Sequence, residues 1–226
     1  MREPIPEGRH HDDANDTRTT RTSMEASPTE ERVTGRSIAK ATRRAALLEA
    51  AATLFAERGY NGVSIEDLGA AAGVSGPAVY RHFAGKPSVL SALLTGVSED
   101  LLDGGRVVAG AAASPDEALK GLIRFQVEFA VSHADVIRVQ DRDLGALAAD
   151  DQRGVRSLQR SYVQVWVDEL AAYRPDTDPS LLRRKVHAVF GLINSTPHTT
   201  HRPSSARELA LFRDLLEEMA WAALTV

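Results

Sequence analysis

Apolar residues recur at helical spacing from about residue 40 to the carboxyl end of this chain. The first predicted helix places Leu48, Ala51, Leu54 and Phe55 on one face, and Gly59 closes it. The segment from about 151 to 173 is apolar over a wider arc, which is typical of a helix surrounded by others. The sequence shows neither an alternating strand pattern nor an internal repeat. The pattern therefore predicts an all-α fold.

Two apolar stripes near the carboxyl end predict a dimer interface. They comprise Leu182, Val186, Val189, Phe190 and Ile193, and then Leu209, Phe212, Leu216, Met219 and Ala223. Because the two helices are consecutive and each is apolar on one side, two copies of the chain could form a four-helix interface. We expect a two-fold homodimer built from residues 179–196 and 205–224. An aspartate at Leu216 or Phe190 should split it by burying a charge.

Start signals place several of the helices. Ser64, Ser114 and Ser205 each precede an acidic residue by three positions, which is the pattern of a capping box. Pro87 and its counterparts Pro115 and Pro179 stand where a first helical residue is expected.

Residues 1–38 contain few apolar side chains, and they are predicted to form a disordered arm. We expect deletion of residues 1–31 to leave the melting temperature unchanged, while basic residues near Lys40 could assist DNA binding. The chain of 226 residues then has room for a small domain, 39–88, and a medium domain, 89–226.

No signal peptide and no membrane-spanning run is present, so the protein is predicted to be soluble and cytoplasmic.

The net charge of −4 is unevenly distributed. Between Lys40 and Ser88 the basic residues outnumber the acidic ones, and the rest of the chain carries the acidic excess. A DNA-facing end is compatible with this division, although the charge does not establish one.

The segment from Ser64 to Phe83 carries the functional signal. It predicts a short helix capped by Ser64, a tight turn at Gly73, and a second short helix capped by Ser75. The inward residues are predicted to be Ile65, Leu68, Val79 and Phe83, with Phe55 beneath them. This geometry would present the second helix to the major groove of DNA.

This segment resembles the DNA-binding domain of the TetR (tetracycline-repressor-like) family. The resemblance rests on Ala72-Gly73-Val74-Ser75 and Tyr80-Arg81-His82-Phe83, followed by Lys86 and Leu90. Two departures are Gly69, where alanine is usual, and Gly76-Pro77 at the start of the second helix. The resemblance implies a homodimeric transcriptional regulator, of the repressor kind, that binds a palindromic operator and is released by a small, largely apolar effector.

The resemblance also implies DNA contacts. Phosphate contacts are expected from Ser64, Tyr80, His82 and Lys86, and the segment Ser75–Arg81, including Gly76, Pro77 and Ala78, is expected to face the bases. Base reading would rest on Ala78, on Arg81 and on close backbone approach at Gly76. Each polar residue has an alternative role: the serines as helix caps, Tyr80 as a core aromatic, and His82 and Lys86 as solvated side chains.

The ligand pocket is expected inside the second domain. Its candidate residues are Phe125, Phe129, Tyr162, Trp166, Phe190 and Asn194. The aromatic residues could instead be ordinary core, and Asn194 could mark the end of its helix. A basic group, Arg138, Arg142, Arg153, Arg156 and Arg160, could receive an anionic effector such as an acyl-CoA, or could form a solvated face.

Catalysis and cofactors are not expected. The chain has no cysteine, and its histidines are scattered, so neither a metal site nor a cofactor is predicted. No Gly-x-Ser-x-Gly elbow, phosphate-cradling loop or dinucleotide-binding turn is present. The alternatives to a DNA-binding regulator are a helical enzyme, which turnover would reveal, and a protein-interaction scaffold without DNA binding.

Overall fold

Every element that the structure describes is a helix, as the hydrophobic pattern predicts. The computed structural model describes residues 28–198 and 205–226, with side chains from residue 37 onward. The α-helices are α1 (Pro28–Arg58), α2 (Ile65–Ala71), α3 (Gly76–Val79), α4 (Lys86–Ala111), α5 (Pro115–Ser132), α6 (Ala134–Asp143), α7 (Ala149–Tyr173), α8 (Pro179–Asn194) and α9 (Ala206–Thr225). Short 3-10 helices lie at Tyr60–Gly62, Leu144–Ala146 and Thr196–His198.

The amino-terminal end differs from the predicted disordered arm over residues 1–38. α1 begins at Pro28, so the last part of that range is helical, and residues 1–27 lie outside the described residues. The sequence there starts with a proline and places Glu30 and Glu31 in the first turn, both of which favour a helix start. The chain forms two compact units, residues 1–39 and residues 40–226, and the second unit contains α2 to α9.

Serine side chains cap three helices at the predicted positions. The Ser64 hydroxyl accepts from the Asp67 amide at 3.0 Å, and the Asp67 carboxylate accepts from the Ser64 amide at 2.8 Å. This pair is a complete capping box at α2. Ser114 and Ser205 accept the corresponding amide hydrogen bonds at α5 and α9. Prolines lie in the first turn of α4, α5 and α8, as expected.

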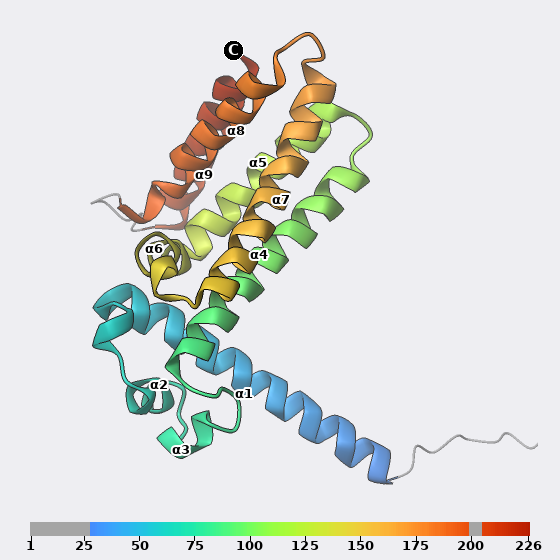
Figure 1. Cartoon of the computed structure of the whole chain (residues 1–226). Helices are drawn as coiled ribbons and strands as arrows, with labels where there is room; N and C mark the ends of the chain where they lie inside the picture. Colours follow the sequence, from blue (N-terminus) through green and yellow to red (C-terminus); the bar gives the residue numbers. More distant parts are fainter. Residues whose placement is uncertain (1–27, 199–204) are drawn as a thin grey trace, which may run out of the picture. The chain divides into compact units, whose positions relative to one another are not determined.

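Two hydrophobic clusters form the interior of the second unit. The first packs α1, α2 and α3 against the first half of α4, and side chains of α6 and α7 close it. The second packs the rest of α4 against α5, α7, α8 and α9, around the fully buried Trp166. α4 therefore runs through both clusters as one continuous helix, drawn in green in Figure 1.

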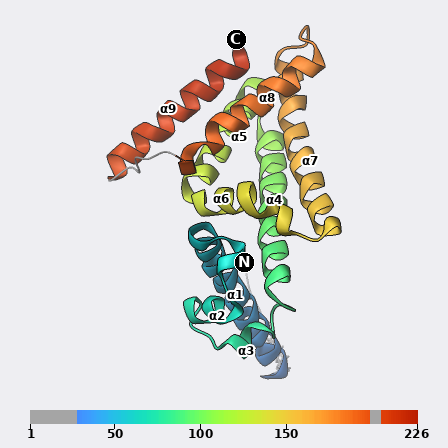
Figure 2. The same ribbon diagram turned by 60° about the vertical axis from the view of Figure 1, so that its left-hand side comes forward.

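α7 lies within the second cluster, in agreement with its wide apolar arc. Its neighbours are α4, α5 and α8, and α9 completes the bundle against α5 and α8, as Figures 1 and 2 show. No helix in the described ranges combines the length and the apolarity needed to cross a membrane. In those same ranges, no three His, Asp or Glu side chains come together in a way that could hold a metal ion.

The apolar stripes of α8 and α9 are not arranged as the predicted dimer interface requires. Leu216 is only 5% exposed, because it packs inside the protomer against the inward face of α8. Phe190 is half-buried and packs its ring against Tyr162 and Trp166. A charge at Leu216 or Phe190 would therefore disrupt the protomer itself, and both are the wrong residues for testing a dimer. The exposed apolar row of α9 consists of Leu211, Leu215 and Met219.

Candidate DNA-binding surface and ligand cavity

A tight turn between α2 and α3 sets the geometry of the candidate DNA-binding surface. Gly73 has a φ of +68°, in the left-handed region that glycine enters without a Cβ penalty, which confirms its predicted role. The Val74 amide donates to the Gly69 carbonyl at 2.8 Å. A Cβ at position 69 would lie only 2.9 Å from the Val74 carbonyl oxygen. The unusual Gly69 thus lets the turn approach α2 closely.

The inner sides of α2 and α3 enclose a small apolar core. The predicted inward residues Ile65, Leu68, Val79 and Phe83 are all buried, and so is Phe55 beneath them. The guanidinium of Arg44 lies 5.1 Å from the centre of the Phe83 ring, a cation–π contact at the edge of this core. The core holds α3 at a fixed angle to α2.

The outward side of α3 and of the residues after it is open to solvent. Val79 faces the core, and some of its neighbours in the short helix Gly76–Val79 and in the following turn face outward. The exposed residues there are Ser75, Pro77, Tyr80 and Arg81, and 57% of the Tyr80 surface is accessible. Gly76 and Ala78 are partly buried. Tyr80 is therefore not a core aromatic.

Ser75 and His82 differ from the simple expectations for them. Ser75 stands at the N-cap position of α3, but its side chain makes no capping hydrogen bond, unlike that of Ser64. His82 is partly buried, and its Nδ1 atom is sheltered from solvent with no hydrogen-bond partner among the described residues. Any DNA contact of His82 therefore falls to its other ring nitrogen, Nε2.

Lys86 is neither a plain solvated charge nor an open phosphate ligand. Its ammonium group donates to the carbonyl oxygens of Tyr60 and Val63, both at 2.9 Å. The same nitrogen lies 4.4 Å from the centre of the Tyr60 ring. A lysine ammonium has three N–H groups, so at most one remains for a phosphate. Lys86 fixes the start of α4 against the segment between α1 and α2.

A cavity of about 200 Å³ lies among α4, α5, α6, α7 and α8. The predicted ligand residues Phe129, Tyr162, Phe190 and Asn194 line it. The other two do not. Trp166 is fully buried, with its ring 5.0 Å from that of Phe190, and Phe125 borders a second cavity of about 320 Å³. Leu101 and Phe129 border both cavities and separate them.

A chain of hydrogen bonds crosses one end of the first cavity. The Tyr162 hydroxyl donates to Gln126 Oε1 at 3.0 Å, and Gln126 Nε2 donates to Asn194 Oδ1 at 2.9 Å. Burial raises the pKa of Tyr162, which keeps the phenol a neutral donor. The carbonyl oxygen of the Asn194 side chain is thus engaged, and its N–H groups are left for a ligand. Gln159 Nε2 is buried with no partner among the described residues.

Sequence reasoning missed several polar residues of this cavity. The missed lining residues are Ser98, Gln126, Gln140, Gln159 and His187. Gln126 is only 1% exposed and interrupts the inward stripe of α5 between Ile123 and Val127. A polar residue on an apolar helix face is a signal that could have identified it, because a buried amide needs partners.

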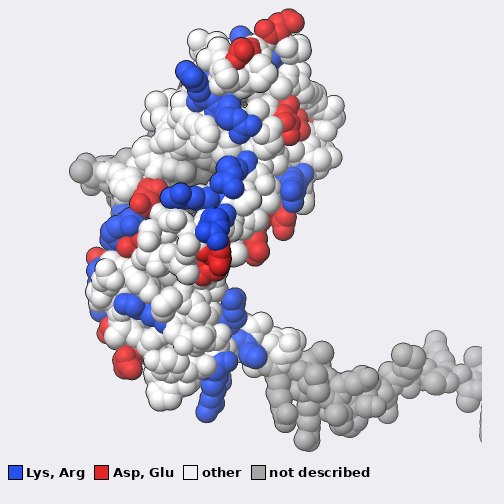
Figure 3. All heavy atoms as spheres, in the orientation of Figure 1, with Lys and Arg blue, Asp and Glu red and all other residues white. Residues whose placement is uncertain are grey.

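The predicted basic group does not form one site. Arg138 pairs with Asp135 at 3.0 Å and donates to the Pro197 carbonyl, and Arg142 pairs with Asp143 at 2.9 Å. Arg153 pairs with Asp150. Arg156 and Arg160 are exposed on α7. Figure 3 shows Lys and Arg side chains in a run over the region where Figure 1 places α7 and α8.

Two family profiles match this chain. The profile "Bacterial regulatory proteins, tetR family" matches residues 47–93, and "Tetracyclin repressor-like, C-terminal domain" matches residues 112–198. The HTH-type transcriptional repressor KstR2 of Mycobacterium tuberculosis is 31% identical over 150 residues, which are 63% of this chain and 75% of KstR2.

Solved structures show the same fold. The structure of ketosteroid transcriptional regulator KstR2 of M. tuberculosis superposes with a TM-score of 0.67 at 26% identity, over 80% of this chain and 93% of that one. AibR, solved in complex with isovaleryl coenzyme A and operator DNA, superposes with a TM-score of 0.64 at 20% identity, over 78% and 97%.

The matches cover both parts of the fold. The first profile spans the turn at Gly73 and the segment Ser75–Arg81, and the second spans all of α5 to α8. The repressor KstR2 aligns over three quarters of its own length. The chain therefore belongs to the tetR family of bacterial regulatory proteins, in which it is a helix-turn-helix transcriptional repressor and not an enzyme.

Proposed function

We propose that this repressor binds a palindromic operator as a two-fold dimer and that an acyl-CoA thioester with an apolar acyl chain releases it. The observation that carries the DNA-binding part is the exposed segment Ser75–Arg81, held from behind by the buried Val79 and Phe83. A short helix presented in this way fits the major groove, where base edges are read. The proposed domains are 39–88 for DNA binding and 89–226 for ligand binding and dimerisation.

The proposed DNA contacts follow the accessibility of each group. Tyr80 contacts a phosphate through its exposed hydroxyl, and His82 does so through Nε2. Ser64 does so by redirecting its O–H, which donates to Asp67 Oδ2 at 2.6 Å in the capping box. Arg81 and Ala78 contact base edges, while Gly76 and Pro77 allow close backbone approach. The Ser75 hydroxyl, which does not cap α3, donates to DNA. Lys86 acts chiefly by positioning α4, with one N–H left for a phosphate.

The proposed dimer uses the outward row of α9. Leu211, Leu215 and Met219 follow one another at intervals of four residues and are 61%, 51% and 44% exposed. Large apolar side chains in a continuous exposed row are typical of a protein interface. A second copy of the chain would cover this row with its own, since a two-fold contact pairs the same surface on both protomers.

The proposed effector places its apolar part in the cavity next to Phe129 and Phe190. The N–H groups of Asn194 and Gln159 can donate to a carbonyl oxygen, such as that of a thioester. The same fold binds isovaleryl coenzyme A in AibR, which supports this ligand class. The two cavities together reach the volume that ligand sites usually have, about 300–1,000 Å³, if Phe129 turns aside.

α4 links the proposed effector site to the proposed DNA surface. Its residues Ser98 and Leu101 line the cavity, and a Cβ at Gly105 would lie 2.5 Å from Tyr162 Cε2. The other end of the same helix is fixed by Lys86 beside the helix-turn-helix. A ligand that displaces Tyr162 would therefore shift α4 and change the spacing of the two α3 helices in the dimer.

The DNA-binding part is tested by selecting bound fragments from a random double-stranded pool and then measuring variants on the selected site. Tyr80→Phe should weaken all sites alike, and Arg81→Ala should change the preferred sequence. Affinity should fall steeply with salt, because phosphate contacts release counterions. Arg124→Ala, an exposed change on α5, serves as the control. Unchanged binding by a Tyr80→Phe, Arg81→Ala double variant would overturn the proposed docking.

The effector part is tested by titrating acyl-CoAs of increasing chain length against the operator-bound protein. Release by about 5- to 150-fold is expected, which corresponds to a coupling of roughly 1–3 kcal/mol. Trp166 fluorescence reports on the cavity, because the Trp166 ring packs against Phe190, which lines it. The Trp221→Phe substitution removes the other tryptophan of the chain, so that the signal comes from Trp166 alone. Absence of release by every chain length would eliminate acyl-CoAs as the effector class.

A further inference from the structure

A basic stripe runs along the outer side of α7 and the adjoining side of α8. Arg153, Arg156 and Arg160 lie on α7, and Arg183 on α8 reaches across to hydrogen-bond with the Gln164 side chain. All four arginines are exposed. Figure 3 shows the run of basic side chains on this face.

The stripe adjoins the opening of the first cavity. Arg156, Gln159, Arg160 and Val163 stand at positions i, i+3, i+4 and i+7 of α7, which form one continuous helix face. Gln159 and Val163 of this face line the cavity. His187 on α8 also lines the cavity and is itself exposed, so the cavity reaches solvent beside it.

The charge of the stripe is only partly compensated. Arg153 pairs with Asp150, and the nearby Asp168 accepts from Gln164 at 2.6 Å. Arg156, Arg160 and Arg183 form no ion pair with any residue that the structure describes, and none of the three belongs to the hydrophobic clusters. An apolar cavity whose rim carries unpaired guanidinium groups suits an amphipathic anion. Guanidinium binds phosphate oxygens in a two-pronged geometry that other side chains do not match.

We propose that Arg156, Arg160 and Arg183 bind the phosphate groups of an acyl-CoA whose acyl chain lies in the cavity. This inference rests on the effector class proposed above and assigns its head-group site. The thioester and its pantetheine arm would pass between Gln159 and His187, with the pyrophosphate and 3′-phosphate lying along the stripe. The row proposed for dimerisation is on α9, whereas the stripe is on α7 and the side of α8 that faces α7.

The site is tested by comparing an acyl-CoA with the matching acyl-pantetheine, which keeps the acyl chain and thioester but has no phosphate. Binding is followed by Trp166 fluorescence and calorimetry at two salt concentrations. The acyl-CoA should bind about tenfold more tightly, or ~1.4 kcal/mol, and this advantage should shrink at high salt. An Arg156→Gln, Arg160→Gln double variant should lose the advantage while binding acyl-pantetheine as before.

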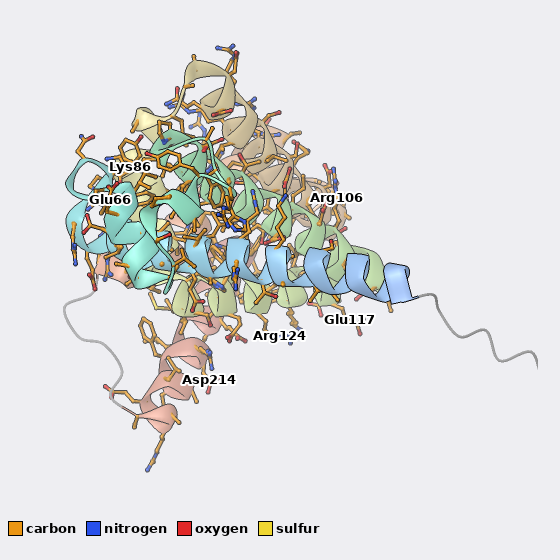
Figure 4. The ribbon with its side chains drawn as sticks, turned by 90° about the horizontal axis from the view of Figure 1, so that it is seen from below. Glu66, Lys86, Arg106, Glu117, Arg124 and Asp214 are labelled. Carbon is orange, nitrogen blue, oxygen red and sulfur yellow. The ribbon has the colours of Figure 1, made fainter. Side chains whose placement is uncertain are left out.

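The matched control is an Arg106→Gln, Arg124→Gln double variant, which removes two exposed arginines from α4 and α5, labelled in Figure 4. It should keep the full preference for acyl-CoA. Equal binding of the two thioesters to the unaltered protein, or a preference that survives loss of Arg156 and Arg160, would overturn the head-group site and leave the effector class standing. Failure of both thioesters to bind would overturn the effector class and the head-group site together.

Discussion

The guanidinium of Arg142, on α6, donates a hydrogen bond of 3.4 Å to the carbonyl oxygen of Ala56 in the last turn of α1. It also donates to the Phe55 carbonyl, which accepts the Gly59 amide at 2.8 Å as well. Carbonyl oxygens at a helix end have no partner within the helix and favour a cation. The buried Asp143 holds the guanidinium through contacts of 3.1 and 2.9 Å and raises the pKa of Arg142. A side chain of the C-terminal domain thus caps the helix that leads into the helix-turn-helix.

Arg142→Ala is expected to weaken the link between the two domains. The loss of hydrogen bonds to the end of α1 should lower stability by about 1 kcal/mol, since the side chain is partly exposed. Effector binding should then change operator affinity by a smaller factor than in the unaltered protein. Arg138→Ala is the control, because Arg138 is on the same helix but its hydrogen bonds go to Asp135 and Pro197 and not to α1. A variant with unaltered stability and unaltered effector response would show that the cap has no such role.

Lys86→Ala is expected to lower stability more than a phosphate-contact mutation would. Two charge-assisted hydrogen bonds, to the Tyr60 and Val63 carbonyls, are lost together with the cation–π contact, which predicts about 1–3 kcal/mol. Tyr80→Phe should leave the unfolding free energy unchanged and weaken only DNA binding, because Tyr80 is exposed. Denaturant unfolding and operator titration separate the two effects. If Lys86→Ala had normal stability but weakened DNA binding, Lys86 would act mainly as a phosphate ligand and not as a positioning residue.

Local signals in the sequence were sufficient for most of the helix-turn-helix, although the cap predicted at Ser75 is wrong, because that side chain makes no capping hydrogen bond. The cap at Ser64, the turn at Gly73 and the inward residue Val79 depend on neighbours within a few positions, and all three are as predicted. The structural role of Lys86 could not be predicted from such local signals. Its partners are carbonyl groups 23 and 26 residues earlier in the chain, which only the fold brings to it.

The cavity was predicted only in part for a similar reason. Helical spacing shows which side chains face inward, but it does not show which inward side chains border a void. Tyr162 and Trp166 have the same inward spacing, yet Tyr162 lines the cavity and Trp166 is packed beneath it. The Gln126–Asn194 hydrogen bond joins residues 68 positions apart, so no local sequence pattern predicts it. The outward row of α9 differs from its inward row by single positions, as Leu215 and Leu216 show.

Gly69→Ala should destabilise the helix-turn-helix although alanine is the better helix former. The added Cβ would lie 2.9 Å from the Val74 carbonyl oxygen and 3.1 Å from the Gly76 nitrogen, so backbone must move. Overpacking of this kind costs about 1–3 kcal/mol. Gly96→Ala on α4 is the matched control, because nothing lies within 4 Å of its Cβ position and the change should stabilise by up to about 1 kcal/mol. Thermal unfolding of both variants decides, and a stabilised Gly69→Ala would contradict the close approach.

The capping box of α2 should give a pH-dependent stability. Hydrogen bonds from the Ser64 hydroxyl and amide lower the pKa of Asp67 below its ordinary value of 3.8, with a smaller effect from Arg58. A carboxyl group whose folded-state pKa is lowered stabilises the fold fully above the ordinary value and loses this contribution as pH falls through the lowered one. Asp67→Asn should therefore reduce the melting temperature at pH 7, and the difference from the unaltered protein should vanish in strong acid. A difference that is constant from pH 7 to pH 2 would contradict this reasoning.

Leu215→Glu should convert the proposed dimer into a monomer without unfolding it. Leu215 is 51% exposed in the protomer, so a carboxylate there remains hydrated when the partner is absent and is desolvated only on association. Leu216→Glu is the matched comparison one position away. Leu216 is 5% exposed within the second cluster, so its replacement should unfold the protomer instead. Sedimentation gives the oligomeric state and circular dichroism gives the fold.

The folded monomer should bind a half-site weakly, because a dimer places its two α3 helices about one DNA turn, roughly 34–36 Å, apart. If Leu215→Glu remained a dimer with unchanged dissociation constant, the interface would have to lie elsewhere than on the row of Leu211, Leu215 and Met219.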